Sequence, residues 1–435
     1  MSGTTVSITT LGCKSNQYDS SAMAERLVSS GMRVVPFPGF AQAYIINTCT
    51  VTSRTDAQSR ALVRRVRKLN PSAVVIVPGC YAQVSPDEAG RADGADYVLG
   101  NAHKADIAGY ISMGRREGNT LTLAGAPKDG TPMTLRASSS GSRTRATMKV
   151  QDGCDKHCSY CIIPKARGRS RSLPLEDVER ELDLLAGKGF KEIVLTGIHL
   201  GAYGADLDVG KDITSVLRLI EKKAYPCRFR ISSLDPDEVS AELVDILKTS
   251  GRICNHMHLP LQSGDDAVIK AMKRGCTREL FAQKVALLAR SVPDISIGAD
   301  VIAGFPGEGD LEFANTYGLL ADLPVTYLHI FPYSKRRGTP AAALKGQLPA
   351  AVIKERCARL KDLDAAKRRA FYGRAIGSSV SVLVEGSLDK ETGLPQGKTA
   401  NYIQAVIEGR DARRNTVVEC RVTGLRDAGV VATPL

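Results

Sequence analysis

The 435-residue chain is longer than one ordinary domain, and its 43% apolar content supports packed cores and excludes a disordered chain. A formal net charge of +13 points to a polyanionic partner. Met1–Thr10 carries no secretory signal and no apolar stretch is long enough to span a membrane, so the 11 cysteines suit thiolate-bound metal in a reducing cytoplasm better than disulfides.

Residues 1–110 alternate short apolar runs with helical patterns. Strands are predicted at Val6–Leu11, Ala43–Asn47 and Ala73–Pro78, and helices at Ser20–Ser30 and Asp56–Leu69. This order predicts an α/β unit, with a parallel sheet covered by helices on its faces.

A cysteine follows each of these three predicted strands, at Cys13, Cys49 and Cys80. Open parallel sheets bind ligands beyond the carboxyl ends of their strands. One such cysteine alone is more often a buried small apolar side chain. Three at the same sheet edge favour a thiolate site.

The segment Gly114–Thr147 is rich in Gly, Ser, Thr, Pro and charge, which predicts a linker and a domain boundary near residue 142. From Ala146 to about Arg374, strand patterns alternate with helical ones. Six strands are predicted, at Thr147–Val150, Glu192–Thr196, Cys227–Ser232, His256–Leu261, Ile295–Ile302 and Val325–Phe331. Helices are predicted at Leu175–Gly187, Asp237–Ser250, Asp265–Lys273, Arg278–Ala289, Leu311–Asp322 and Ala351–Tyr372. Repeated βα units predict a barrel or part-barrel with its chemistry at the carboxyl ends of the strands.

Three cysteines lie within eight residues of the loop after the first of these strands, in Cys154-Asp-Lys-His-Cys158-Ser-Tyr-Cys161. Such clustering in an intracellular enzyme favours an iron–sulfur cluster. Three thiolates leave one iron of a four-iron cluster open for a small ligand. A zinc site lacking its fourth ligand, a disulfide with a spare thiol, and coincidence remain alternatives.

From Ile376 onward the chain shows only short alternating stretches separated by Gly-bearing turns. These predict a small all-β barrel with strands at Val380–Val384, Tyr402–Ile407, Val417–Val422 and Gly429–Ala432. On pattern alone, this barrel binds RNA, caps the molecule or makes a dimer.

The spacing CxxxCxxC, with Gly153 before it and Ile162–Gly168 after it, resembles the radical S-adenosylmethionine (SAM) enzymes, in particular their methylthiotransferase branch. The resemblance implies a (βα)6 partial TIM barrel at 142–374 whose 4Fe-4S cluster is held by Cys154, Cys158 and Cys161. It implies an amino-terminal domain at 1–141 that holds an auxiliary 4Fe-4S cluster through Cys13, Cys49 and Cys80. Residues 375–435, with Gly397–Tyr402, resemble the RNA-binding TRAM barrel.

Several residues at strand ends resemble SAM-binding positions of this family. The run from Asp300 through Gly304 and Gly307 to Glu308 resembles the segment on the adenine side of SAM, although a strand–turn–helix with a capping Glu uses the same residues. Thr196 and Gly197 stand where related enzymes bind the SAM amino group. Ser232 and Gln262 are predicted to bond the SAM ribose or carboxylate, or else to cap helices. The histidines near strand ends are predicted to be structural.

Basic residues flank the predicted metal sites, although such runs usually mark solvated faces. Arg167, Arg169 and Arg171 follow the Cys154 loop and are predicted RNA contacts. Lys398 and Tyr402 are predicted RNA contacts by their resemblance to the TRAM segment.

Thr10–Tyr18 and Lys165–Ser172 most resemble the methylthiotransferases of threonylcarbamoyladenosine in tRNA. The resemblance implies conversion of that nucleoside, at position 37 just 3′ of the anticodon, to its 2-methylthio derivative, with two 4Fe-4S clusters and SAM as cofactors. Implied partners are the tRNA anticodon stem-loop and an electron donor such as flavodoxin or ferredoxin, with the protein a cytoplasmic monomer and the sulfur donor open. Alternatives are methylthiolation of isopentenyladenosine tRNA or of a ribosomal-protein aspartate, and a non-catalytic RNA-binding metalloprotein.

Overall fold

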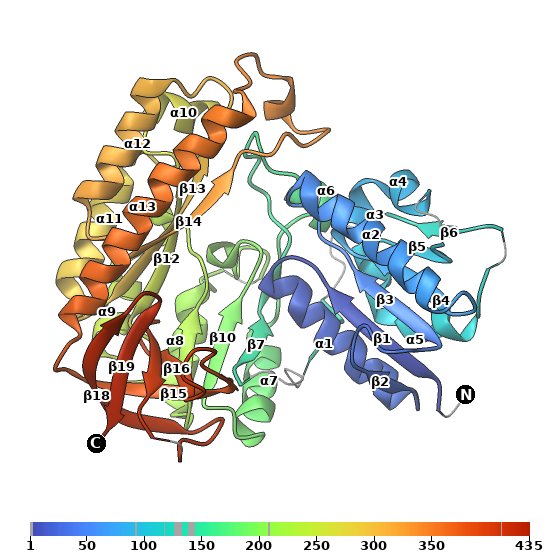
Figure 1. Cartoon of the computed structure of the whole chain (residues 1–435), viewed down its shortest axis with the longest axis horizontal. Coiled ribbons are helices and arrows are strands. Elements are labelled where there is room, and N and C mark those ends of the chain that lie inside the picture. The colour runs from blue at the N-terminus through green and yellow to red at the C-terminus, as the bar shows by residue number, and fades with distance from the viewer. Residues whose placement is uncertain are drawn as a thin grey trace.

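The computed structural model describes residues 3–91, 94–116, 118–125, 133–137, 144–207, 209–409 and 411–435. The predicted boundary near residue 142 and much of the predicted linker lie outside these ranges. Three bodies follow one another along the chain: a parallel sheet, an array of βα units and a small barrel (Figure 1). No helix in the described ranges is both long and apolar enough to cross a membrane.

The amino-terminal body is a six-stranded parallel sheet in the order β2-β1-β3-β4-β5-β6. Its strands are β1 Thr5–Thr10, β2 Arg33–Val35, β3 Ala43–Asn47, β4 Val74–Pro78, β5 Tyr97–Leu99 and β6 Leu121–Leu123. Its helices are α1 Lys14–Ser29, α2 Ser53–Leu69, α3 Cys80–Val84, α4 Pro86–Gly90 and α5 Ile107–Ser112. The central strands β3 and β4 are buried along their whole length because helices cover both faces, as their continuous apolar sequences require.

The middle body has two three-stranded parallel sheets, β7-β10-β11 and β12-β13-β14. Phe229 of β11 bridges to Ile253 just before β12, so the six strands follow one another in chain order, as predicted for a part-barrel. The strands are β7 Ala146–Lys149, β10 Glu192–Thr196, β11 Arg228–Ile231, β12 His256–Gln262, β13 Ser296–Ala303 and β14 Tyr327–Pro332. The helices are α6 Ile163–Arg167, α7 Leu175–Gly187, α8 Ile213–Lys223, α9 Ala241–Thr249, α10 Asp266–Ala271, α11 Arg278–Ser291, α12 Asp310–Asp322 and α13 Ala350–Arg374. The largest apolar core lies between these helices and one face of the strands.

The carboxyl-terminal body is a closed five-stranded barrel in the order β15-β16-β17-β19-β18. Its strands are β15 Ser379–Leu388, β16 Pro395–Thr399, β17 Gln404–Ile407, β18 Val417–Arg426 and β19 Gly429–Pro434. The prediction of a small all-β barrel is confirmed, with β16 as an additional strand. The guanidinium groups of Arg228 and Arg230 donate to the main-chain oxygens of Lys398 and Ala400 at 2.7 and 2.9 Å, which fastens the barrel to β11.

The amino-terminal body lies against the open side of the part-barrel, with α1 beside β7 (Figure 1). The carboxyl-terminal barrel lies near the starts of β7 and β10 (Figure 1). The three bodies meet on one side of the part-barrel, here called the common interior, where α1, β7, β10, β11 and the carboxyl-terminal barrel together line a cavity.

Candidate active site

The loop that carries Cys154, Cys158 and Cys161 is held closely at its base. Gly153 has φ +79°, and a Cβ atom there would lie 1.9 Å from the carbonyl oxygen of Arg169, so only glycine fits this crossing. The short strands β8 Gln151–Asp152 and β9 Arg171–Ser172 pair across the same point. The NH of Ser159 donates to Met272 at 2.9 Å, which ties the middle of the loop to the end of α10. The loop is thus positioned at the carboxyl end of β7, as predicted.

The chemistry of these three thiols fits an iron–sulfur cluster. None of the chain's cysteines forms a disulfide, and these three are partly buried. Burial, with the neighbouring Cys158 and Cys154 adding to it, raises the pKa of Cys161 to about 12. The NH of Ile163, which donates to the Sγ of Cys161 at 3.5 Å, opposes this rise. Burial also raises the pKa of Cys158, and a bound cation would stabilise such thiols as thiolates. The NH-to-sulfur bond is of the kind that tunes such clusters.

The cysteines Cys13, Cys49 and Cys80 lie at the carboxyl ends of the adjacent strands β1, β3 and β4. Gly12 has φ +98°, and a Cβ atom there would lie 2.6 Å from the Sγ of Cys49, so the first and second cysteine segments touch. Thr48 bridges to Gly79, which brings the second and third segments together. Burial, with Cys80 and Cys13 adding to it, raises the pKa of Cys49 to about 12. The predicted juxtaposition of the three thiols is present.

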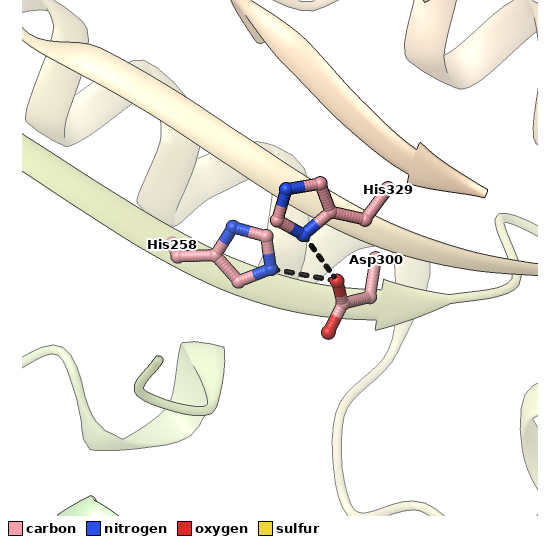
Figure 2. A group of neighbouring side chains, drawn as sticks. All are labelled: His258, Asp300 and His329. Carbon is pink, nitrogen blue, oxygen red and sulfur yellow. Dashed lines mark hydrogen bonds and ion pairs between the residues drawn. The ribbon is translucent and has the colours of Figure 1, made fainter. Parts of the chain in front are cut away.

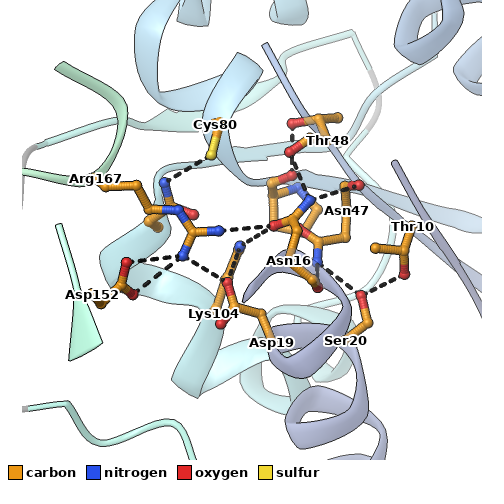
Figure 3. Close-up of polar contacts among 12 residues, drawn as sticks. Thr10, Asn16, Asp19, Ser20, Asn47, Thr48, Cys80, Lys104, Asp152 and Arg167 are labelled. Atoms are coloured by element: carbon orange, nitrogen blue, oxygen red, sulfur yellow. Dashed lines mark hydrogen bonds and ion pairs between the residues drawn. The ribbon is translucent and has the colours of Figure 1, made fainter. Parts of the chain in front are cut away.

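A buried polar network joins the regions of the two cysteine groups (Figure 3). Arg167 of α6 reaches Asp19 of α1 at 3.0 Å and Asp152 of β8 at 3.2 Å. Lys104 donates to Asp19 at 2.7 Å, and Lys149 donates to both carboxylates at 2.6 and 2.8 Å. Burial opposes ionisation of Asp152, but Arg167 and Lys149 outweigh it and lower its pKa to about 2.

The prediction that Arg167 contacts RNA is corrected by this network. Its side chain is 1% exposed because both of its carboxylate partners lie inside the protein. Arg169, by contrast, is 71% exposed and pairs with Asp155 at 3.5 Å, and Arg171 is 16% exposed beside Asp152. Nothing in the sequence signals the partners Asp19 and Lys104, because they come from distant helical segments.

The predicted SAM-binding residues Thr196, Gly197, Ser232 and Gln262 lie at the carboxyl ends of β10, β11 and β12. The sequence did not indicate Gln151, whose Oε1 accepts from the NH groups of Ile198 and His199 at 2.9 and 2.8 Å and fixes the turn after β10. Burial lowers the pKa of His199, but hydrogen bonds to Cys154 and Glu238 outweigh it and raise the pKa to about 10. A histidine predicted to be structural therefore touches a candidate cluster ligand.

Glu308 does not reach outward as a ligand. Its side chain is 1% exposed, accepting from the NH of Gly304 at 2.8 Å and from Arg356 at 2.7 Å. The carboxylate holds the turn after β13 closed, which corrects its predicted contact with SAM. Gly304 and Gly307 both have positive φ in this turn, at +84° and +86°.

Asp300 lies between two histidines on neighbouring strands (Figure 2). His258 of β12 is 2.7 Å from its Oδ1 and His329 of β14 is 3.3 Å from it. Burial opposes ionisation of Asp300, but the two histidines hold its pKa well below the usual range. These ligand types suit a divalent cation. Hydrogen bonding to Asp300 accounts for the arrangement on its own.

The His258–Asp300–His329 group faces the common interior. The residues that alternate with it, such as Leu259, Ala299 and Leu328, pack in the core under the helices. Tyr402 of the carboxyl-terminal barrel reaches the same side, with its ring 4.7 Å from that of His256 and its centroid 4.2 Å from the Nζ of Lys398. Lys398 and Tyr402, both predicted RNA contacts, are therefore directed toward the part-barrel.

The part-barrel and its three-thiol loop are the features of a radical SAM enzyme. The family model "Radical SAM superfamily" matches residues 148–320, and "Uncharacterized protein family UPF0004" matches residues 5–100. The fold is similar to that of the radical S-adenosylmethionine methyltransferase TsrM from Kitasatospora setae, with a TM-score of 0.56 and 16% identity, covering 78% of this chain and 77% of that one.

Relatives of known name match almost the whole chain. The threonylcarbamoyladenosine tRNA methylthiotransferases MtaB of Bacillus subtilis and Thermotoga maritima are 36% and 38% identical, covering 96% and 98% of this chain and 93% and 96% of theirs. A tRNA-2-methylthio-N(6)-dimethylallyladenosine synthase of Moorella thermoacetica is 32% identical, with 96% of each chain covered. This chain belongs to the radical SAM methylthiotransferase family.

Proposed function

We propose that this protein methylthiolates carbon 2 of threonylcarbamoyladenosine at position 37 of tRNA. The observation that carries the proposal is the placement of two three-cysteine groups. One lies at the carboxyl end of β7 and the other at the edge of the amino-terminal sheet, and the two bodies that hold them lie against each other. Higher identity to the two MtaB proteins than to the dimethylallyladenosine synthase supports the choice of nucleoside.

Cys154, Cys158 and Cys161 would hold the 4Fe-4S cluster that, when bound, supplies the electron for reductive cleavage of SAM. Thr196, Gly197, Ser232 and Gln262 lie at the strand ends beside this loop and would orient SAM. Gly304 and Gly307 let the main chain after β13 approach a ligand closely. The Glu308–Arg356 pair would keep that turn in shape.

Cys13, Cys49 and Cys80 would hold the auxiliary 4Fe-4S cluster, with which the sulfur to be inserted would be associated. Gly12 and Gly79 allow the close approach of their segments. The Arg167 network would fix the distance between the two cysteine groups, because it ties α6, which follows the Cys154 loop, to α1, which follows Cys13.

The remaining partners follow from charge and family. The net charge of +13 favours tRNA, and the exposed Arg169 would meet its phosphates. We further propose a cytoplasmic monomer, reduced by flavodoxin or ferredoxin, with functional units at 1–141, 142–374 and 375–435.

Single Cys→Ala variants test the two roles separately, with the reconstituted enzyme assayed anaerobically for two products. Variants of Cys154, Cys158 or Cys161 should lose both 5′-deoxyadenosine and methylthiolated nucleoside. Variants of Cys13, Cys49 or Cys80 should still form 5′-deoxyadenosine but no methylthiolated nucleoside. Intact methylthiolation in any of the latter three would refute the auxiliary site, and the exposed Cys13 provides the most direct case.

A further inference from the structure

A cavity of about 630 Å³ lies where the three bodies meet. Such a volume suits a small ligand or a large substituent. Its lining comes from the start of α1, from the inner faces of β7, β10 and β11, and from the carboxyl-terminal barrel. It includes Lys14, Arg145, Glu192, Arg230, Tyr402 and Arg414.

The lining is cationic, with Lys14, Arg145, Arg230 and Arg414 against two carboxylates. Both carboxylates already have arginine partners. Glu192 accepts from Arg230 at 2.8 Å, and Glu385 pairs with Arg145 at 2.5 Å. Both carboxylates are therefore paired without Lys14.

Lys14 adds positive charge to the cavity wall. Within the described part of the chain its ammonium group makes no hydrogen bond or ion pair, although it lines the cavity. Lys14 directly follows Cys13, so a group bound to it lies next to the edge that carries the second cysteine group. An unpaired ammonium beside paired carboxylates selects an anion.

We propose that this cavity binds the N6 substituent of the substrate adenosine and that Lys14 bonds its carboxylate. This inference rests on the proposed function. It identifies Lys14 as the residue that selects a threonylcarbamoyl over a dimethylallyl substituent. A threonylcarbamoyl group carries a carboxylate and a hydroxyl, whereas a dimethylallyl group is a hydrocarbon. In adenine, carbon 2 and the carbon that bears N6 are separated by one ring nitrogen. These positions are close together on the ring, so a base with carbon 2 near Cys13 brings its N6 substituent near Lys14 and the cavity.

The test measures binding of anticodon stem-loop RNAs to the full-length, cluster-loaded protein by fluorescence anisotropy. One RNA carries threonylcarbamoyladenosine and the other carries its methyl ester, which removes the negative charge. The wild-type protein should bind the acid at least about tenfold more tightly, as expected for a charge-assisted hydrogen bond. Lys14→Met should bind both RNAs with nearly equal affinity, whereas Lys14→Arg should keep the preference. Lys248→Met, at an exposed position of α9, is the matched control and should behave as wild type.

Iron content measured on each variant shows whether the neighbouring Cys13 still binds its cluster. Equal binding of acid and ester by the wild-type protein, or an unchanged preference in a cluster-loaded Lys14→Met protein, would overturn the inference. Either result leaves the proposed function standing if the wild-type enzyme still methylthiolates threonylcarbamoyladenosine. Absence of that product from the loaded wild-type enzyme would remove both.

Discussion

At the scale of single residues, glycine sets the geometry around three of the six clustered cysteines. Gly12, Gly79 and Gly153 each precede a cysteine, and each has φ between +79° and +113°. A side chain at any of them would collide with a neighbouring segment. These glycines therefore shape the candidate metal sites, although they offer no ligand.

Gly12→Ala should impair the auxiliary site, because the new methyl group would lie 2.6 Å from the Sγ of Cys49. We expect the reconstituted variant to hold about half of the wild-type iron, the remainder being on the Cys154 loop. Gly31→Ala is the matched control, since Gly31 has φ +79° but no atom within 4 Å of its Cβ position. Full iron content in Gly12→Ala would contradict this account of the crossing.

The six cysteines could be predicted from their spacing and their positions after strands. The prediction that Arg167 lies at the surface was wrong. A basic run after a loop is typical of a solvated surface. The two carboxylates that bury this guanidinium lie 15 and 148 residues away along the chain, so no local pattern reveals them. His199, Gln151 and Glu238 were missed as a group for the same reason.

Arg167→Met should destabilise the protein strongly, because it removes one of the two cations shared by the buried Asp19 and Asp152 and leaves only Lys149 between them. Breaking such a buried pair costs about 3–5 kcal/mol in the free energy of unfolding. Arg169→Ala removes only an exposed pair and should cost about 1 kcal/mol or less. Urea unfolding of the two variants measures the difference. Similar midpoints would show that the network contributes little to joining the bodies.

At the scale of elements, segments with a clear apolar pattern were predicted well, and segments with a polar or weak pattern were not. Ala43–Asn47, Leu175–Gly187 and Glu192–Thr196 have their predicted bounds, because burial on one or both faces demands a clear pattern. The strand β16 contains Pro395 and Gly397, which weaken its strand pattern. It is nevertheless a strand, because it pairs with β15 and β17 to close the barrel. The helix α1 begins at Lys14, six residues earlier than predicted, because its first turn is polar although Ser15 and Asn16 in it are buried.

The contact between α1 and α7 should make stability depend on pH. Burial raises the pKa of Glu181 to about 7, although Arg136 and a hydrogen bond from Tyr18 oppose this. Between the usual glutamate pKa and about pH 7, the folded protein keeps a proton that the unfolded chain has released. The free energy of unfolding should therefore fall as pH rises through this range.

Glu181→Gln keeps an acceptor for Tyr18 without the charge, so its urea unfolding midpoint should fall less between pH 5 and pH 7.5 than that of wild type. Glu176→Gln, at an exposed position of the same helix, should retain the wild-type slope. Identical slopes in all three proteins would show that Glu181 is not the titrating group.

At the scale of the whole molecule, three bodies are held together by arginines that cross between them. Arg167 joins the part-barrel to α1, and Arg228 and Arg230 join it to the carboxyl-terminal barrel. Arg336, after β14, reaches Asp56 at 2.6 Å, 280 residues away, and also donates to Thr50, which directly follows Cys49. The order of the three bodies could be predicted from the strand and helix patterns along the sequence. How the bodies pack against one another depends on these arginine contacts between residues far apart in the sequence, which no local pattern reveals.

The central claim is that this protein methylthiolates one tRNA nucleoside, threonylcarbamoyladenosine. The most direct test expresses the protein in a host that lacks its own enzyme and analyses digested tRNA by nucleoside mass spectrometry. We expect threonylcarbamoyladenosine to gain the mass of a methylthio group in place of hydrogen, while isopentenyladenosine stays unchanged. A shift on isopentenyladenosine instead, or no shifted nucleoside with both clusters loaded, would contradict the account.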